Sequence, residues 1–155
     1  MTKFWTSQKR EFIFAVFVLV VVALVSWVNY QVSLARSRDA TRMAQVSDVA
    51  RSLDDYYYDF GSYPPADNDG QILACGGRPC YWGGKFDSYM TLPNDPLAGR
   101  HYFYQVATDG ASFKVWAALE MPKAIDRPPE KVIPWCGNAK CTYRQVGSGG
   151  DPDKY

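Results

Sequence analysis

The sequence predicts an α+β protein in which a long N-terminal helix runs from a membrane into the space outside the cell and packs on a small antiparallel β-sheet. Three observations predict this class. An uncharged apolar run fills residues 12–28, neither proline nor glycine occurs from Met1 to Phe60, and short aromatic stretches separated by turn residues follow Pro65. The first two predict one continuous helix, and the third predicts a small sheet.

Residues 12–28 are predicted to span a membrane. The run has 17 residues without a charge, a glycine or a proline. It would give roughly 25 Å of helix, which is at the short end for a bilayer core of about 30 Å. Trp27 and Tyr30 fall where aromatic side chains line a membrane surface. A cleaved secretory signal is the alternative, but Ser26-Trp27-Val28 is a poor cleavage site, so we expect the run to be kept as an anchor.

The charges before the run predict its orientation. Lys3, Lys9 and Arg10 precede it, and positive residues favour the cytoplasmic side. We therefore expect residues 1–11 to be a cytoplasmic flank. The chain would cross the cytoplasmic membrane once, with its C-terminal domain outside.

Residues 29–60 are predicted to continue the helix as its amphipathic outer half. The composition turns polar over residues 35–42, and Gly61 and Pro64-Pro65 then suit the end of the helix. Between them, apolar side chains recur every three or four residues, the spacing of one buried helix face. They are Met43, Val46, Val49, Ala50, Leu53, Tyr56, Tyr57 and Phe60. We interpret this stripe as the surface on which the outer domain packs.

Residues 61–146 are predicted to form a small globular β domain. A loop is expected at residues 66–70. Strands are predicted over residues 100–106 and 112–119, joined by an Asp109-Gly110 hairpin turn. Weaker strand candidates are Val132–Ile133 and Thr142–Val146, and residues 147–155 are predicted to be a flexible tail.

The composition excludes several classes of function. Lysine and arginine number 17 and aspartate and glutamate 16, so the net charge is +1 and lacks the basic excess of a nucleic-acid-binding protein. The single histidine, His101, supports neither a His-rich metal site nor a nucleophile–base–orienter constellation. No glycine-rich loop fits a phosphate. We predict a protein that is not an enzyme and has no nucleic-acid partner.

The four cysteines form two local pairs, Cys75 with Cys80 and Cys136 with Cys141, each with four residues between its members. In an oxidising compartment outside the cell, disulfides are favoured. Four cysteines allow three pairings, of which we expect the local one. An all-cysteine zinc site is the alternative.

Several motifs follow one another in a characteristic order. Glu11 directly precedes the apolar run, and the long helix continues outward through Asp39, Arg42 and Leu53. It closes with Tyr56–Pro64, which is similar to the pattern Tyr-x-x-Asp-x-Gly-x-Tyr-Pro. Leu92–Pro96 then matches Leu-Pro-x-Asp-Pro, and an aromatic strand, an Asp-Gly turn and a second strand follow. From Glu11 to Glu120 the chain resembles the type IV pilin and type II secretion pseudopilin family.

This resemblance implies a filament subunit of a type IV pilus or a type II secretion pseudopilus. Such subunits wait in the membrane, are extracted by an assembly platform and its motor, and stack with their helices at the centre. The implied partners are copies of this chain or other pilin-like subunits, the membrane, and the assembly machinery. The matched Glu11 would pair with the N-terminal amine of a neighbour. The residues expected to serve subunit assembly are Glu11, Phe12, Phe14, Phe17, Leu19 and Leu24.

The start of the chain departs from the family pattern. The family's processing site has a small residue followed by apolar side chains, whereas Thr6–Arg10 stands here. We therefore expect the first residues to be kept. Glu11 then has an alternative role as a carboxylate at the start of a helix. The alternative for the whole protein is an anchored binding protein of pilin-like shape that does not polymerise.

Some pseudopilins hold calcium through acidic residues, so Asp67, Asp69 and Asp95 are weak calcium candidates here. No full calcium-loop pattern is present, and an ordinary solvated turn is the alternative. No other cofactor is expected.

Overall fold

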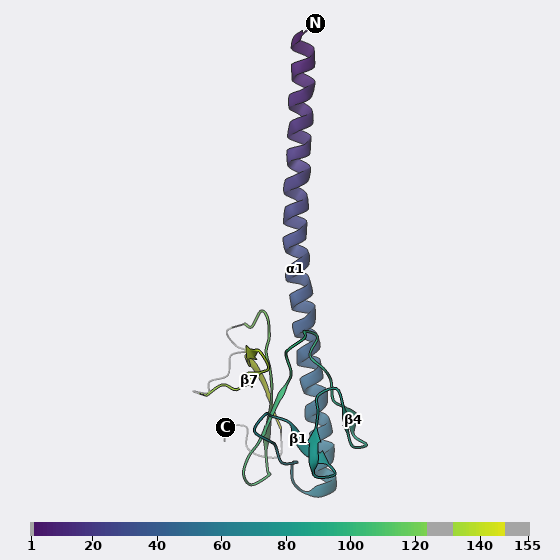
Figure 1. Ribbon diagram of the computed structural model, residues 1–155, viewed down its shortest axis with the longest axis vertical. Helices are drawn as coiled ribbons and strands as arrows, with labels where there is room; N and C mark the ends of the chain where they lie inside the picture. The colour runs from purple at the N-terminus through teal and green to yellow at the C-terminus, as the bar shows by residue number, and fades with distance from the viewer. Residues whose placement is uncertain (1, 124–131, 148–155) are drawn as a thin grey trace. The chain divides into compact units, whose positions relative to one another are not determined.

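The computed structural model describes residues 2–123 and 132–147, and the side chains of residues 11–123 and 132–147. Within these residues, one helix, α1 (Thr2–Phe60), is followed by nine short strands. Figure 1 shows the helix and the strands that follow it. The chain divides into two compact units, residues 1–37 and residues 38–155. A long N-terminal apolar helix followed by small antiparallel sheets confirms the predicted α+β class.

Helix α1 has 59 residues and includes most of the predicted flank 1–11, because it begins at Thr2. The helix ends at Phe60, directly before Gly61, the glycine that was expected to close it. The N–H of Gly61 donates to the carbonyl oxygen of Tyr57 at 2.7 Å, and Gly61 has a φ of 73°. A left-handed residue of this kind closes a helix, and glycine adopts that conformation without strain.

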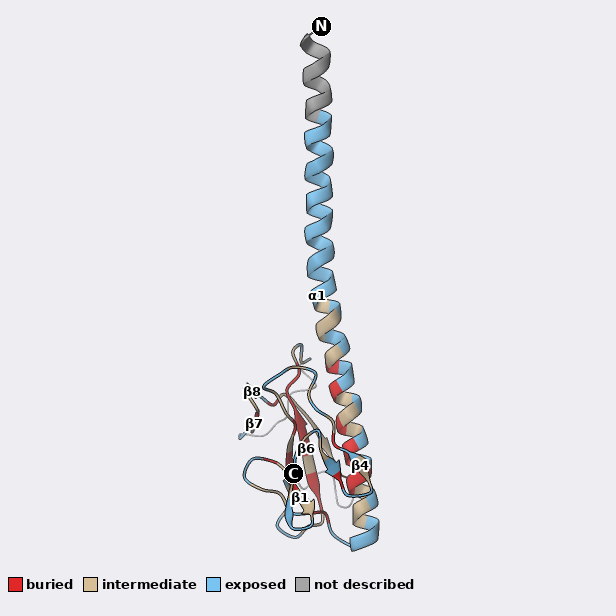
Figure 2. Cartoon of the chain, turned by 45° about the vertical axis from the view of Figure 1, so that its right-hand side comes forward, coloured by how far each residue is buried: buried red, intermediate tan, exposed pale blue. Residues whose placement is uncertain are grey.

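The stripe predicted on the outer half of α1 is buried at its centre. Val46, Val49 and Leu53 have no exposed surface, and Ala50 is buried as well. Figure 2 shows buried positions in the C-terminal part of α1. Phe60 was predicted to belong to the stripe, and this was wrong, since its side chain is 60% exposed. It is the last residue of the helix and lies against Tyr56, with 4.4 Å between the ring centroids.

The main sheet has three antiparallel strands, β5 (Phe103–Val106), β6 (Phe113–Ala117) and β9 (Tyr143–Val146), in the order β5-β6-β9. These strands lie within the predicted segments 100–106, 112–119 and 142–146. The pairing sets Tyr104 opposite Val115, and Val115 opposite Gln145. Strand β6 is therefore the central strand, and four of its five residues are buried.

Three two-stranded hairpins complete the outer unit. They are β1 (Ile72–Cys75) with β2 (Arg78–Cys80), β3 (Lys85–Phe86) with β4 (Met90–Thr91), and β7 (Trp135–Cys136) with β8 (Ala139–Lys140). The strand predicted at Val132–Ile133 was wrong. Val132 is 83% exposed, and the pairing begins only after Pro134, where the disulfide hairpin closes.

Of the predicted tail 147–155, Gly147 lies directly after β9, and its N–H donates to the carbonyl oxygen of Phe113 at 3.1 Å. The other tail residues, 148–155, lie outside the described part of the chain.

The core between α1 and the sheet is rich in aromatic side chains. Tyr63 meets Phe113 edge to face at 4.6 Å between ring centroids, and the buried Tyr104 hydroxyl donates to the carbonyl oxygen of Pro64 at 2.7 Å. A second, smaller cluster joins Trp116 to Cys136 and Cys141. Aromatic side chains supply the large buried area that a small unit needs, and a hydroxyl that is buried must find a partner.

Candidate functional site: an exposed apolar helix and a buried charge cluster

The apolar segment of α1 is exposed on all sides within its own unit. Every side chain from residue 11 to residue 31 is exposed. The side chains expected to serve assembly are among the most exposed, at 71% for Phe12, 67% for Phe14, 63% for Phe17, 67% for Leu19 and 62% for Leu24. Within the described residues, one helix, α1, is long and apolar enough to cross a membrane. Exposed apolar surfaces of this size are typical of segments that contact a membrane or another protein.

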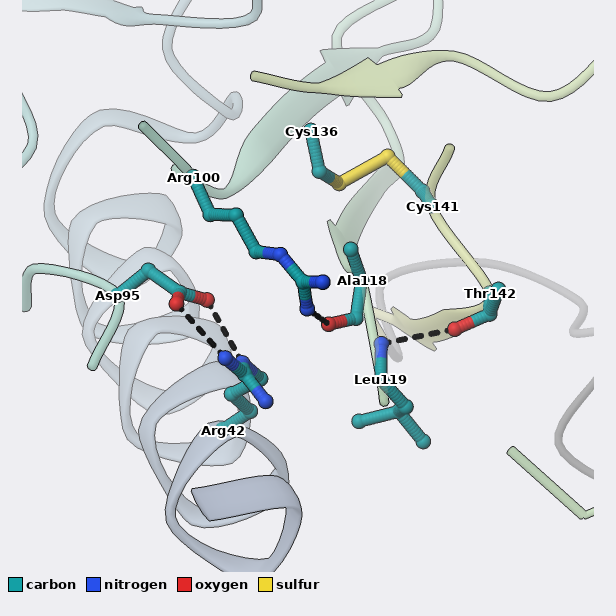
Figure 3. Close-up of a disulfide and its surroundings, with 8 residues drawn as sticks. All are labelled: Arg42, Asp95, Arg100, Ala118, Leu119, Cys136, Cys141 and Thr142. Carbon is teal, nitrogen blue, oxygen red and sulfur yellow. Dashed lines mark hydrogen bonds and ion pairs between the residues drawn. A yellow bond between two sulfur atoms is a disulfide. The ribbon is translucent and has the colours of Figure 1, made fainter. Parts of the chain in front are cut away.

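A cluster of charged side chains is buried where α1 meets the outer domain. The Arg42 side chain has no exposed surface. Its Nε and Nη2 donate to the two carboxylate oxygens of Asp95 at 2.8 and 2.9 Å (Figure 3). Its Nη1 donates to Asp39 Oδ1 at 2.7 Å and to Glu120 Oε1 at 2.8 Å. One guanidinium therefore contacts three carboxylates, each from a different part of the chain.

A second arginine completes this charge cluster, which consists of Arg38, Asp39, Arg42, Asp95 and Glu120. Arg38 donates through Nε and Nη2 to the two oxygens of Glu120, at 2.8 and 2.7 Å. The Asp39 carboxylate accepts the backbone N–H groups of Glu120 and Met121, at 2.9 and 2.8 Å. Buried charges of this kind are tolerated only when they are paired and hydrogen-bonded, and here they are.

The cluster shifts the pKa values of its members. Hydrogen bonds from Arg38, together with those from Arg42, lower the pKa of Glu120 to about 2 against the opposing effect of burial. Burial lowers the pKa of Arg42, but the hydrogen bonds to Asp95 and Glu120 outweigh it, so the net pKa is raised. Both groups therefore stay charged at neutral pH, and the cluster is a permanent connection between α1, the loop that carries Asp95, and the chain after β6.

Sequence reasoning missed this cluster, because residues 35–42 were interpreted only as a polar stretch. Asp39 and Arg42 are buried together with Val46, Val49 and Leu53, and they stand at the same three- and four-residue spacing. That spacing was the available signal, since it extends the buried helix face by two charged positions.

Both pairs of cysteines form local disulfides, Cys75–Cys80 and Cys136–Cys141. With the thiols paired in this way, no thiolate is left for an all-cysteine zinc site. The second disulfide lies near the end of β6, where Arg100 donates to the carbonyl oxygen of Ala118 and the N–H of Leu119 donates to Thr142 Oγ1 (Figure 3). The disulfide hairpin is thus connected to the centre of the outer unit.

The structure does not bring the three calcium candidates together. Asp95 binds Arg42, whereas Asp67 Oδ1 accepts the backbone N–H groups of Asp69 and Gln71 at 3.0 and 2.7 Å. Across residues 2–123 and 132–147, no group of three or more acidic, histidine or cysteine side chains is arranged to hold a metal ion.

Comparison with known proteins agrees with the order of the motifs. The family model for protein G of the type II secretion system, the major pseudopilin, matches residues 29–118. This region contains the charge cluster's arginines and Asp95, and it ends just after β6. No curated protein and no solved structure matches the chain. The match covers more than half of the sequence, and the chain therefore belongs to the type II secretion system protein G family of pseudopilins.

Proposed function

We propose that the chain is a pseudopilus subunit that waits in the inner membrane and then polymerises. Residues 12–28 would hold it in the bilayer, with the N-terminus inside and the outer domain outside. The observation that carries the proposal is the exposed apolar surface of α1, in a chain of the protein G family. Lipid chains and neighbouring apolar helices can each cover such a surface, so the same segment serves both stages.

These two stages, in the membrane and in the filament, imply the partners of the chain. In the filament, copies of the chain or other pseudopilins would surround the residues from Phe12 to Leu24, and an assembly platform with its motor would extract the subunit. Glu11 is exposed at the start of the apolar run. A carboxylate among apolar helices is costly unless it is paired. The family resemblance implies that Glu11 pairs with the N-terminal amine of a neighbour, which would set the axial position of each new subunit.

Cross-linking between helices tests polymerisation. We expect the Phe17→Cys/Leu24→Cys double variant, which carries two linkable thiols on each subunit, to give linked species at multiples of the 17.5 kDa subunit mass when it is oxidised in cells that contain the secretion machinery. The same chain in cells without the machinery is the control and should give at most a dimer. A single adduct with a different protein would instead support the alternative of an anchored binding protein that does not polymerise.

Glu11→Ala tests the pairing role. We expect the variant to remain in the membrane fraction, because the apolar run is intact, but to lose the cross-linked multimers. Glu11→Asp keeps the charge and should retain part of them. Multimers at the normal level in Glu11→Ala would show that Glu11 is only a carboxylate at the start of a helix.

A further inference from the structure

A groove lined by aromatic side chains opens on the outer unit, and none of the five residues of the charge cluster lines it. Its volume is about 690 Å³, and segments far apart in the sequence line it: Asn68–Gln71, Tyr81-Trp82, β5 with His101, and the β7–β8 hairpin. A volume of several hundred Å³ is typical of small-molecule sites. We propose that this aromatic groove binds a neutral carbohydrate chain.

The aromatic side chains at the rim do not belong to the core. Tyr81 is 66% exposed and Trp135 57% exposed, and neither is part of the two buried clusters. Lys140 Nζ lies over the Trp135 ring, 5.8 Å from its centroid. Trp82 and Phe103 line the same groove and are half-buried. A flat aromatic face in water is suited to stacking, and the apolar C–H face of a sugar ring is a ligand surface that fits it.

The disulfides fix the two aromatic walls. Cys80 directly precedes Tyr81-Trp82, and Cys136 lies between Trp135 and Gly137. Trp82 packs edge to face on the buried Tyr102, at 5.3 Å between ring centroids. A binding surface that is rigid before the ligand arrives loses less conformational entropy on binding.

The hairpin wall is also in direct contact with the chain that leads into β5. A Cβ atom on Gly137 would lie 2.2 Å from the carbonyl oxygen of Gly99, so only glycine fits there. The neighbouring Asn138 N–H donates to that same oxygen at 2.9 Å. The β7–β8 hairpin lies after residue 118, where the match to the protein G family ends. The groove is therefore formed partly by a segment outside the region that this chain shares with its family.

The loop wall is fixed in the same way. The turn held by Asp67 presents Asn68 and Asp69 to the groove, and the N–H of Tyr104 donates to the carbonyl oxygen of Gly70 at 2.9 Å. This contact attaches the loop to β5.

The polar lining selects the class of ligand. Among the described residues that line the groove, Asp69 is the one carboxylate and there is no lysine or arginine; Lys140 lies over the Trp135 ring but is not part of this lining. A lining with a carboxylate and without a cation disfavours phosphates and other anions. Side-chain acceptors are plentiful, on Asn68, Asp69 and Gln71. A proline-rich peptide also suits an aromatic groove, but it offers mainly carbonyl acceptors. Sugar hydroxyls donate as well as accept, so they match this lining better.

Two buried polar atoms on residues that line the groove also favour a ligand with hydroxyl groups. Gln71 Oε1 and Trp82 Nε1 are buried and have no hydrogen-bond partner among the described atoms. An unpaired buried polar atom is costly. A rotation of either side chain toward the groove would give an acceptor or a donor to a ligand hydroxyl, which can pair with both.

The test uses the full chain in a detergent without a sugar head group, since glycoside detergents would compete. Cellulose, chitin and starch are offered as insoluble probes, and their soluble oligosaccharides are titrated by tryptophan fluorescence and calorimetry. We expect retention on at least one polysaccharide. Trp135→Ala and Tyr81→Ala should each weaken the Kd by about tenfold through loss of one stacking face.

Tyr58→Ala is the matched control, because Tyr58 is an aromatic residue on α1 that is 85% exposed and does not line the groove. It should bind like the unmodified chain. Circular dichroism and non-reducing electrophoresis verify that each variant is folded with both disulfides. The proposal is overturned if the unmodified chain binds none of the three sugars at ~10 mM. It is also overturned if all variants bind equally, or if poly-L-proline binds and the sugars do not.

Discussion

The Arg42 guanidinium is fully buried and forms ion pairs with three carboxylates. Arg42→Met keeps most of the volume but leaves Asp39, Asp95 and Glu120 without their shared cation. We expect the free energy of unfolding to fall by about 3–5 kcal/mol, because removing one partner of a buried network leaves uncompensated charge. Denaturant titration of the full chain in detergent measures this loss.

Arg51 on the same helix provides the comparison. Its side chain is 78% exposed and lies 3.7 Å from Asp48. Arg51→Met should change the free energy of unfolding by less than about 0.5 kcal/mol, because exposed pairs contribute little. Equal effects of the two substitutions would show that the buried network is not important for stability.

Glu120 gives the outer domain a defined response to acid. Its pKa falls from 4.5 to about 2 on folding, with Arg38 as the largest cause. A lowered carboxylate pKa stabilises the folded state fully above the unfolded value and progressively less as the pH falls through the folded value. We expect the free energy of unfolding to fall as the pH is lowered from about 5 to about 2, because this group loses its charge over that range.

Denaturant midpoints measured across that pH range test the effect of Glu120. Glu120→Gln should be less stable at pH 6 and should respond less steeply between pH 4.5 and pH 2. An unchanged slope in Glu120→Gln would assign the acid response to other carboxylates.

At the scale of single residues, the sequence was informative where the chemistry is local. Each cysteine pair has four residues between its members, and compartment and spacing together favour the disulfides that the structure contains. The charge cluster was not predicted, because Arg42 is 53 residues from Asp95 and 78 from Glu120. No local pattern shows that distant charges will meet.

At the scale of elements, α1 could be predicted because its pattern is long. The absence of breakers over 60 residues and the repeated apolar spacing are strong signals. Strands β1 to β4 have two to four residues each, too few to show a period of two, and they were not predicted. Strands β5, β6 and β9 lie within the predicted segments, but the predicted segments extended beyond the strands into loops.

The apolar segment of α1 can be tested as a membrane anchor by adding charge. Two lysines at the exposed positions 19 and 22 should together add about 5–7 kcal/mol to the free energy of membrane insertion. This cost opposes most of the favourable free energy of transferring the apolar run from water to the bilayer. We expect Leu19→Lys with Val22→Lys to leave the membrane pellet after alkaline extraction. Leu19→Ile with Val22→Ile should stay in the pellet. Full retention of the lysine variant would contradict the anchoring role.

The two disulfides close loops of equal length but differ in burial. Cys136 and Cys141 are both buried against Trp116, whereas Cys75 is only half-buried. Loop entropy alone assigns each about 2 kcal/mol. Cys80 is buried in the main core cluster. We expect Cys136→Ser with Cys141→Ser to lower the free energy of unfolding more than Cys75→Ser with Cys80→Ser, because it places two hydroxyls rather than one in a buried apolar cluster. Denaturant titration of both double variants decides this, and the reverse order would contradict it.

At the scale of the whole molecule, the predicted family was confirmed because its evidence is an order of motifs rather than any single one. The structure gives two of these motifs a physical reason. Asp95 of the Leu92–Pro96 segment is the bidentate partner of Arg42, and Tyr63, at the end of the helix motif, donates to Asp54 at 2.7 Å. The aromatic groove was not predicted, since its walls come from four separate segments that only folding brings together.

The charge cluster also has a mechanical consequence. Apolar contacts are not directional, so the buried stripe alone would allow small slides of the helix against the sheet. A slide by one residue moves a side chain by about 1.5 Å along the axis and turns it by about 100°, which would break the paired bonds between Arg42 and Asp95. An axial pull on the outer domain would therefore load these ion pairs in shear. The position of the domain along residues 38–60 of the helix is then set by charge geometry, and a subunit under tension would keep its length.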